Sequence, residues 1–413
     1  MTLASKTSVA PAPPRGVAYR YVILGVAFLA QMALSSVSQA LMALGVLYQS
    51  DFSLSRTSVG MIASSGALGH VVILFFAGAL ADTFGIRRMI LLGLTVAVGG
   101  LVLFALAPSY PIMLVGVFIA GFGSSLASPA VTKTVISWFP PRVRATAMGI
   151  KQTGVPLSGA LGGLLLLPLG VASGWRVSVA VIAAAVVAIA VCAVALYRDP
   201  PTEAEAAPRR TGGRGLLRET LALRDVWLVG FLALSLAAAQ FVIITYLVLY
   251  MKEVLLVPVV VAGGYLALAN FSGLGTRVVS GLISDRLLGA RRKPLLVVFG
   301  VLMPLLLAVT AMVGQGTPLP LVTMLVVALG VAAIGSHALF LTLMAELAGT
   351  RRAATSVGLG LTLVQLGALA APPIFGQIVD RTGSYSLAWG VFAVVAAAGA
   401  VAIMLVREPV RSA

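Results

Sequence analysis

The chain is poor in the residues with which enzymes do chemistry. Among its 413 residues there is one cysteine, Cys192, and there are two histidines, His70 and His337. A single cysteine excludes an intrachain disulfide. The sequence also has no phosphate-binding loop, no clustered metal ligands and no nucleophile–His–acid set. We therefore expect neither enzymatic activity nor a cofactor nor a metal site.

Charged residues are also scarce, at 10% of the chain, whereas 60% of its residues are hydrophobic. A soluble protein needs much more charge than this to face water. Apolar runs of about 20 residues recur along the chain, and each can cross roughly 30 Å of hydrocarbon as a helix. Breaks at charged, Pro and Gly clusters delimit twelve spans, which we place at 19–48, 57–80, 88–107, 110–137, 144–168, 175–197, 226–251, 258–283, 294–313, 320–346, 353–378 and 386–406.

The only long polar segment divides these spans six and six. We therefore expect an all-α membrane protein with an N-terminal tail at 1–18 and a six-helix bundle at 19–198. A cytoplasmic linker at 199–225, a second bundle at 226–407 and a C-terminal tail at 408–413 complete the predicted chain.

The basic residues give this arrangement an orientation. With the N-terminus in the cytoplasm, 21 of the 28 Lys and Arg residues fall on the cytoplasmic side and four on the other. Such a bias is the positive-inside signal, and it predicts that both termini are cytoplasmic. It also accounts for the net charge of +16 without nucleic-acid binding. We expect a monomeric, multi-pass protein of the cytoplasmic (inner) membrane whose large partner is the lipid bilayer.

The two halves share a motif. Span 2 closes with Gly78-Ala-Leu-Ala-Asp82-Thr-Phe-Gly85-Ile-Arg87-Arg88, and span 8 closes with Gly281-Leu-Ile-Ser-Asp285-Arg286-Leu-Leu-Gly289-Ala-Arg291-Arg292. A further junction repeats as well, because Arg144-Ala-Thr-Ala-Met-Gly149 is echoed by Arg352-Ala-Ala-Thr-Ser-Val-Gly358. Two bundles built from parallel repeats place a binding site between them, near the middle of the membrane.

The repeated motif is similar to the signature of the major facilitator superfamily. It has the Gly, then three residues and the Asp, the Gly turn and the basic cluster, with Thr83 where a basic residue is usual. The resemblance covers residues 19–408 and implies a cytoplasmic gate whose ion pairs form and break as the halves rock. The alternative is that the arginines only set topology. The candidate gating residues are Asp82, Arg87, Arg88, Arg142, Arg144, Asp285, Arg286, Glu346 and Arg351.

Three cations fall inside spans, Lys133, Lys151 and Arg277, whereas none of the twelve acidic residues lies near the middle of one. A charge in hydrocarbon is costly and is by default a functional hypothesis. Lys133 is close enough to the end of its span to extend to the interface. Two cations in one cavity without a carboxylate favour an anionic substrate, and the planar arginine fork matches a carboxylate.

The stretch from Arg277 to Arg286 is similar to span 8 of the monocarboxylate and oxalate carriers of the superfamily. That resemblance implies that Arg277 binds the carboxylate of the substrate. The two histidines are the in-span groups that titrate near neutral pH, so they are candidates for proton coupling as well as for simple packing. The candidate substrate-binding residues are Arg277, Lys151, His337, His70, Gln31, Gln240 and Asn270.

The favoured function is secondary active transport of a small organic anion, a carboxylate, by alternating access. Coupling to protons and exchange both stay open, so the carrier is a symporter or an antiporter. The alternative is a multidrug or lipophilic-compound exporter of the same fold, against which stands the missing in-span acid. A transport-inactive sensor or scaffold is a third reading, and the sequence shows no added signalling domain for it.

Overall fold

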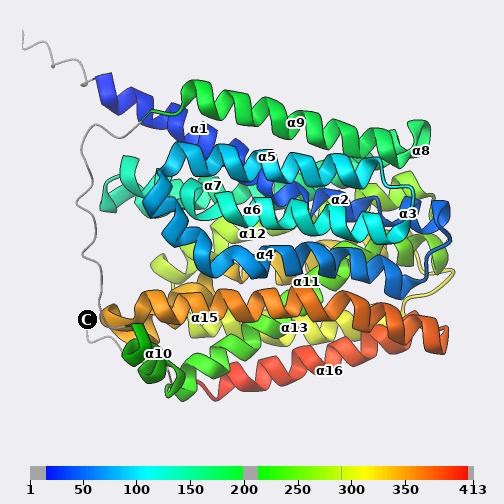
Figure 1. Ribbon diagram of the computed structural model, residues 1–413. Coiled ribbons are helices and arrows are strands. Elements are labelled where there is room, and N and C mark those ends of the chain that lie inside the picture. Colours follow the sequence, from blue (N-terminus) through cyan, green and yellow to red (C-terminus); the bar gives the residue numbers. More distant parts are fainter. Residues whose placement is uncertain (1–14, 199–212, 290, 408–413) are drawn as a thin grey trace, which may run out of the picture.

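A computed structural model describes residues 15–198, 213–289 and 291–407. The regular elements of these residues are all helices, and they lie side by side with α1 beginning and α16 ending at the same end of the molecule (Figure 1). Twelve helical segments are long and apolar enough to cross a membrane. The prediction of an all-α protein with twelve spans is thus confirmed. Residues 1–14 of the predicted N-terminal tail, 199–212 of the linker and the tail 408–413 lie outside the described residues.

The first half follows the predicted order of six spans. Its helices are α1 (Arg15–Ser36), α2 (Ala40–Ala43), α3 (Gly45–Asp51), α4 (Arg56–Phe84), α5 (Ile86–Ala105), α6 (Tyr110–Trp138), α7 (Pro141–Leu161), the π-helix η1 (Gly162–Leu166), α8 (Leu167–Ser173) and α9 (Trp175–Leu196). Gly85 has φ 84°, a value open to glycine, and it lets α4 end and α5 begin one residue later. The predicted glycine turn of the repeated motif is therefore present.

The second half begins with a short helix in the predicted linker. Its helices are α10 (Gly213–Leu221), α11 (Arg224–Glu253), α12 (Val259–Arg286), α13 (Lys293–Met312), α14 (Leu319–Gly335), α15 (His337–Thr382) and α16 (Tyr385–Met404). α15 contains the end of span 10 and all of span 11, and the two parts are separated at Gly349, where φ is 74° and ψ is 165°.

Two predicted spans are broken. Span 1, expected to run over 19–48, ends as a helix at Ser36 and continues only after a turn. The hydroxyl groups of Ser35 and Ser36 donate to the carbonyls of Gln31 and Ala33 at 2.8 and 2.7 Å. Such bonds compete with the helix ladder and bend it. Span 10 is interrupted at Ser336, a turn residue between α14 and α15 whose φ and ψ stay in the helical region.

The two halves meet along two helix pairs, α4 with α15 and α7 with α12. The second pair continues into η1, where a Cβ atom on Gly163 would lie 2.3 Å from the carbonyl oxygen of Gly263. Helices in a membrane approach this closely only through small residues. Gly159 and Gly163 of span 5 therefore serve packing between the halves, which sets α12 against α7.

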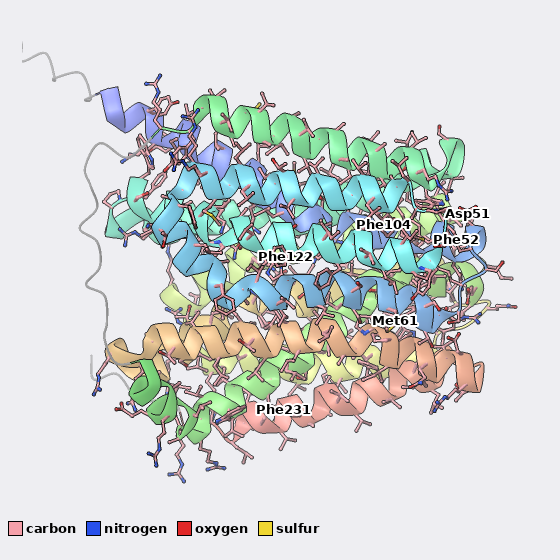
Figure 2. All side chains as sticks on the ribbon, in the orientation of Figure 1. Asp51, Phe52, Met61, Phe104, Phe122 and Phe231 are labelled. Atoms are coloured by element: carbon pink, nitrogen blue, oxygen red, sulfur yellow. The ribbon has the colours of Figure 1, made fainter. Side chains whose placement is uncertain are left out.

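At the end of the bundle opposite α10, α3 is tied to α9 within the first half. Asp51 accepts hydrogen bonds from the indole of Trp175 and from Arg176, each at 2.8 Å, and these hydrogen bonds lower the pKa of Asp51. Figure 2 shows Asp51 and Phe52 together at this end. Because both partners belong to the first half, this tie can persist while the halves move.

Candidate substrate site and gates

Arg277 is anchored at the break in span 10. The break at Ser336 leaves carbonyl groups of α14 available, and the guanidinium Nε of Arg277 donates to Ile334 O at 3.1 Å. Ser280, one turn further along α12, donates to the carbonyl of Gly335 at 3.2 Å. Non-helical backbone is tolerated at membrane depth where it is buried in protein or lines a cavity, and such breaks occur at transporter binding sites.

The same guanidinium also reaches the other half. Its Nη1 donates to the carbonyl of Gln152 on α7 at 3.2 Å. These two bonds occupy two of the five N–H donors of an arginine. The described residues offer no further partner, so three donors are available to a ligand placed between the halves.

Lys151 lies beside Gln152 and is only 2% exposed. Its Nζ donates to Thr132 Oγ1 on α6 at 2.8 Å, and Thr132 in turn donates to the carbonyl of Ser128 at 3.0 Å. The ion pairs among the described residues include neither Lys151 nor Arg277. Lys133, by contrast, is exposed. The structure therefore places a partly buried Arg277 across the boundary between α12 and α7, and a buried Lys151 on α7 with its ammonium group against α6.

His337 joins this group because it begins the helix that follows the break. Its ring lies within electrostatic range of the Arg277 guanidinium. It also packs edge-on against Phe340, with the ring centroids 5.0 Å apart. His337 is thus placed where a change in its charge would act on Arg277.

A chamber of about 100 Å³ with a mixed apolar and polar lining lies between the halves. Gln31 and His70, both predicted as substrate-binding residues, line it together. The rest of its lining comes from α1, α4, α6, α11 and α15, and includes Ser35, Ser124, Ser128, Phe241, Gln365 and Ala368. Ser128 links the chamber to Lys151 through Thr132. Neither Lys151 nor Arg277 is among the residues that line the chamber, so Lys151 is connected to it only through these two hydrogen bonds.

The last two predicted binding residues lie elsewhere. Gln240 is buried on α11 next to Phe241, and it is not among the residues that line the chamber. Asn270 donates to the carbonyl of Leu266 in its own helix at 2.9 Å, and its amide packs against Gly159 of α7. Both roles stay predictions, and the position of Asn270 is that of a residue packed between helices.

The predicted gate lies at the end of the bundle that carries α10. The side chains of Asp82, Arg142 and Asp285 lie outside the described residues. Arg87 donates to the carbonyl of Val194 at 2.9 Å, and Arg144 donates to that of Phe139 at 3.2 Å. Each of these bonds stays within the first half.

The remaining candidates are Arg88 of the first half and three residues of the second half. Arg88 and Arg286 are exposed. Glu346 pairs with Arg292 at 3.8 Å, and Arg351 pairs with Glu219 of α10 at 3.4 Å. Both of these ion pairs lie within the second half. The formation of ion pairs between the halves at this end therefore stays a prediction.

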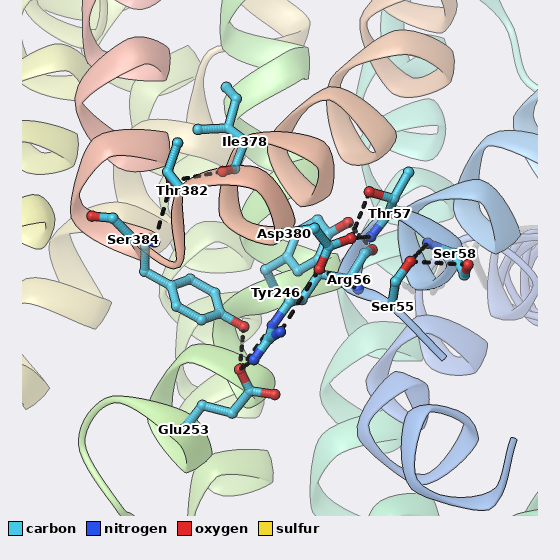
Figure 3. A network of polar contacts seen from close by, with 11 residues as sticks. Ser55, Arg56, Thr57, Ser58, Tyr246, Glu253, Ile378, Asp380, Thr382 and Ser384 are labelled. Carbon is cyan, nitrogen blue, oxygen red and sulfur yellow. Dashed lines mark hydrogen bonds and ion pairs between the residues drawn. The ribbon is translucent and has the colours of Figure 1, made fainter. Parts of the chain in front are cut away.

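An ion-pair network that we did not predict connects the halves at the opposite end (Figure 3). Arg56, at the start of α4, contacts Glu253 at the end of α11, with Nη2 and Nε 2.8 and 3.2 Å from Oε2. The same carboxylate oxygen accepts from Tyr385 at 2.9 Å. The hydroxyl of Tyr246 donates towards the carbonyl of Arg56 at 2.7 Å.

Asp380, near the end of α15, completes this network by capping α4 from the other half. Its Oδ1 accepts from the backbone N–H of Arg56 at 3.0 Å, and its Oδ2 from that of Thr57 at 2.7 Å. A carboxylate at a helix N-terminus satisfies free N–H groups and the helix dipole. We call Arg56, Thr57, Tyr246, Glu253, Asp380 and Tyr385 the inter-bundle latch.

The sequence did contain a signal for the latch. Asp380 and Glu253 are acidic residues at the ends of spans on the side that carries few basic residues, where Arg56 opens span 2. Their pairing could not be read from the sequence, because it depends on how α4 packs against α15. Below the latch, Ser64 donates to the carbonyl of Leu369, which lacks a helix partner because Pro373 has no N–H.

Residues 23–372 match the family model of the Major Facilitator Superfamily. The chain belongs to the major facilitator superfamily. As a member of that superfamily it is a multi-pass membrane transporter of small organic substrates rather than an enzyme. The resemblance seen in the repeated motif is thereby confirmed.

Individual relatives are distant but cover most of the chain. An uncharacterized MFS-type transporter of Mycobacterium tuberculosis is 28% identical over 81% of this chain and 74% of its own length. A probable sulfoacetate transporter of Cupriavidus necator is 24% identical over 94% of both chains. A hexuronate transporter of Bacillus subtilis is 33% identical, over 32% of each chain.

Solved structures show the same fold. A bacterial homologue of the human lysosomal transporter Spinster, in an inward-facing and occupied conformation, has a TM-score of 0.78 with 18% identity, and the match covers 96% of this chain and 97% of that one. The nucleoside transporter NupG has a TM-score of 0.76 with 15% identity over 93% and 99% of the two chains. At this identity the likeness concerns the fold alone.

Proposed function

We propose that this superfamily member is a secondary active transporter that carries a small organic anion, a carboxylate, by alternating access. It would do so as a monomer in the cytoplasmic membrane, with both termini on the cytoplasmic side. The observation that carries the proposal is the contact of Arg277 with Gln152 of α7, the residue that follows the buried cation Lys151 in the sequence. An anion bound there would neutralise buried charge for which the described residues offer no carboxylate.

The energetics favour an anion over a cation or a neutral compound. A charge in hydrocarbon costs roughly 2.5–3.5 kcal/mol on insertion scales, so two cations inside spans are costly unless something offsets them. A carboxylate accepts two parallel N–H donors from an arginine, which fixes its orientation as well as its charge. The N–H donors of Arg277 that have no partner among the described residues could bind such a carboxylate. Lys151 on α7 would add a second positive charge.

The named substrates of several relatives support the same class. Besides the sulfoacetate and hexuronate transporters, a 3-(3-hydroxy-phenyl)propionate transporter of Escherichia coli is 27% identical over 79% of both chains. Each of these three substrates is an organic acid that is ionised at neutral pH. If this chain transports the same class of substrate, its in-span cations would bind the acid group. The names of the relatives do not say which residues do so.

The position of the cations suggests how binding and movement are coupled. Arg277 belongs to the second half and already touches Gln152 of the first, so an anion that engages Arg277 and Lys151 would hold α12 and α7 together. Release of the latch at one end and formation of ion pairs at the other would then expose the site to alternate sides. Protons are the candidate coupling ion through His337, which lies in range of Arg277, and exchange of one anion for another is the other mode.

Uptake into liposomes tests the proposal directly. We expect purified protein to transport at least one acid from a panel of labelled mono- and dicarboxylates, with nitrate and a cationic drug as comparisons. Arg277→Lys keeps the charge but loses the planar fork, and we expect at least about a tenfold loss of anion affinity. Lys133→Gln removes an exposed in-span cation and serves as the matched control. Transport of the drug without transport of any acid would refute the proposed function.

A further inference from the structure

The outer face of the first half carries a groove that the transport cycle does not use. It lies between α5 and α9 and has a volume of about 510 Å³. Its walls are almost wholly apolar, and Leu91, Val187 and Val191 are exposed along it, Val191 by 62%. Among the described residues that line it, Arg87 is the one charged residue.

Arg87 closes one end of this groove. Its Nη2 donates to the carbonyl of Val194 on α9 at 2.9 Å, so the guanidinium lies across the groove rather than between the halves. This bond uses one of five N–H donors, and the side chain is exposed. The groove therefore ends at a cation that can still bind an anion.

Aromatic residues show at which depth this end lies. Tyr19 donates to the carbonyl of Leu196 at 2.6 Å, and Arg198 stacks over the Tyr19 ring with its guanidinium carbon 4.5 Å from the centroid. The indole of Trp138 donates to the carbonyl of Arg198 at 3.2 Å. Tyr and Trp gather where hydrocarbon meets the polar headgroups. The end of α9 is thus at headgroup depth.

From that depth the groove enters the hydrocarbon. The lining of α9 runs from Val194 back to Val187, a distance of about 10 Å along a helix. The basic residues place this end in the cytoplasmic leaflet, whose surface is negative because of anionic lipids. An apolar channel of this length below a guanidinium matches the upper part of an acyl chain below a phosphate.

We propose that the groove between α5 and α9 binds one anionic phospholipid of the cytoplasmic leaflet, with its phosphate on Arg87. One acyl chain lies along Leu91, Val187 and Val191. Arginine binds phosphate through parallel hydrogen bonds, and the described residues of the lining include no acidic side chain that would repel it. Since Arg87 follows the Gly85 turn that ends α4, the bound lipid holds the start of α5 against α9.

Native mass spectrometry of the purified full chain tests this assignment. The protein is mixed with phosphatidylglycerol and phosphatidylcholine of identical acyl chains, and the retained lipid is counted. We expect one phosphatidylglycerol to be retained with a preference of about fivefold, the effect of one arginine near an anionic surface. Arg87→Gln should abolish the preference. Arg88→Gln should keep it, because Arg88 is exposed but does not line the groove.

A second variant tests the groove without a change of charge. Val191→Trp fills the space from an exposed position on α9 and should reduce the retained phosphatidylglycerol as strongly as Arg87→Gln does. Equal losses in Arg87→Gln and Arg88→Gln, or full retention in Val191→Trp, would show diffuse attraction to the surface and overturn the proposal. The readout is bound lipid, so it does not depend on which solute the protein transports.

Discussion

Lys151 shows how a single residue can serve ligand binding at the expense of folding. Its ammonium group is buried and has only the hydroxyl of Thr132 as a described hydrogen-bond partner. A neutral partner offsets little of the cost of moving a charge out of water. A residue that is unfavourable for stability and yet placed beside the boundary of the halves is expected to act on the ligand.

We therefore predict opposite effects of Lys151→Met on stability and on binding. Methionine fills a similar volume without a charge, so the melting temperature of the ligand-free protein should stay the same or rise. The affinity for the transported acid should fall at least about tenfold, because a charge-assisted contact is lost. Thermal unfolding with and without the acid measures both quantities. A lower melting temperature with unchanged acid binding would instead make Lys151 a structural residue.

The residues that could be predicted from the sequence are those whose type conflicts with their surroundings. Arg277 and Lys151 are charges in apolar runs. A charge inside a run that crosses the membrane can be recognised directly along the sequence. Arg56 and Asp380 lie at span ends, where charge is normal, so their positions in the sequence do not indicate that they pair. The contact between them arises only when α4 and α15 pack together.

At the scale of elements, the spans were predictable and their interruptions were not. Twenty apolar residues suffice to indicate a helix that crosses the membrane. The interruption at Ser336 is not marked by a proline. It matters for the site because the carbonyl of Ile334, two residues earlier, accepts a hydrogen bond from Arg277. A hydropathy pattern averages over such a single residue. The feature that shapes the site is thus smaller than the pattern that predicts the fold.

Two adjacent glycines of α12 allow a matched test of the packing between the halves. A Cβ on Gly263 would lie 2.5 Å from the carbonyl oxygen of Gly163, whereas a Cβ on Gly264 would meet no atom within 4 Å. We expect Gly263→Ala to lower the melting temperature and the transport rate, because backbone cannot move aside easily. Gly264→Ala should be neutral or stabilising by up to about 1 kcal/mol through helix propensity. Equal melting temperatures would mean that α7 and α12 do not pack this closely.

At the scale of the whole molecule, the latch and the substrate region lie on different sections of the same boundary. The latch joins the start of α4 to the ends of α11 and α15, and Arg277 joins α12 to α7. The predicted gate and the latch therefore differ in the residues from which they are built. The predicted gate lies at the motif repeated in the halves, whereas the latch uses residues without such a repeat, Arg56, Glu253 and Asp380.

The latch should set the balance between the two access states. Arg56 and Glu253 are partly exposed, at 37% and 21%, so their ion pair is worth about 1 kcal/mol or less. The caps that Asp380 gives to the N–H groups of Arg56 and Thr57 add to this. We expect Asp380→Asn or Arg56→Ala to raise the population open at the latch end about fivefold.

The single native cysteine makes that population measurable. Replacing Cys192 by Ser gives a background in which a cysteine placed at Ser64, just below the latch, can be labelled by a membrane-impermeant thiol reagent. Labelling from the latch side should rise in Asp380→Asn. The matched control is Asp51→Asn, which breaks the ion pair with Arg176 at the same end but within one half, and it should leave labelling unchanged. If both variants raise labelling equally, the latch does not hold the halves together, and local loosening of this end explains the effect.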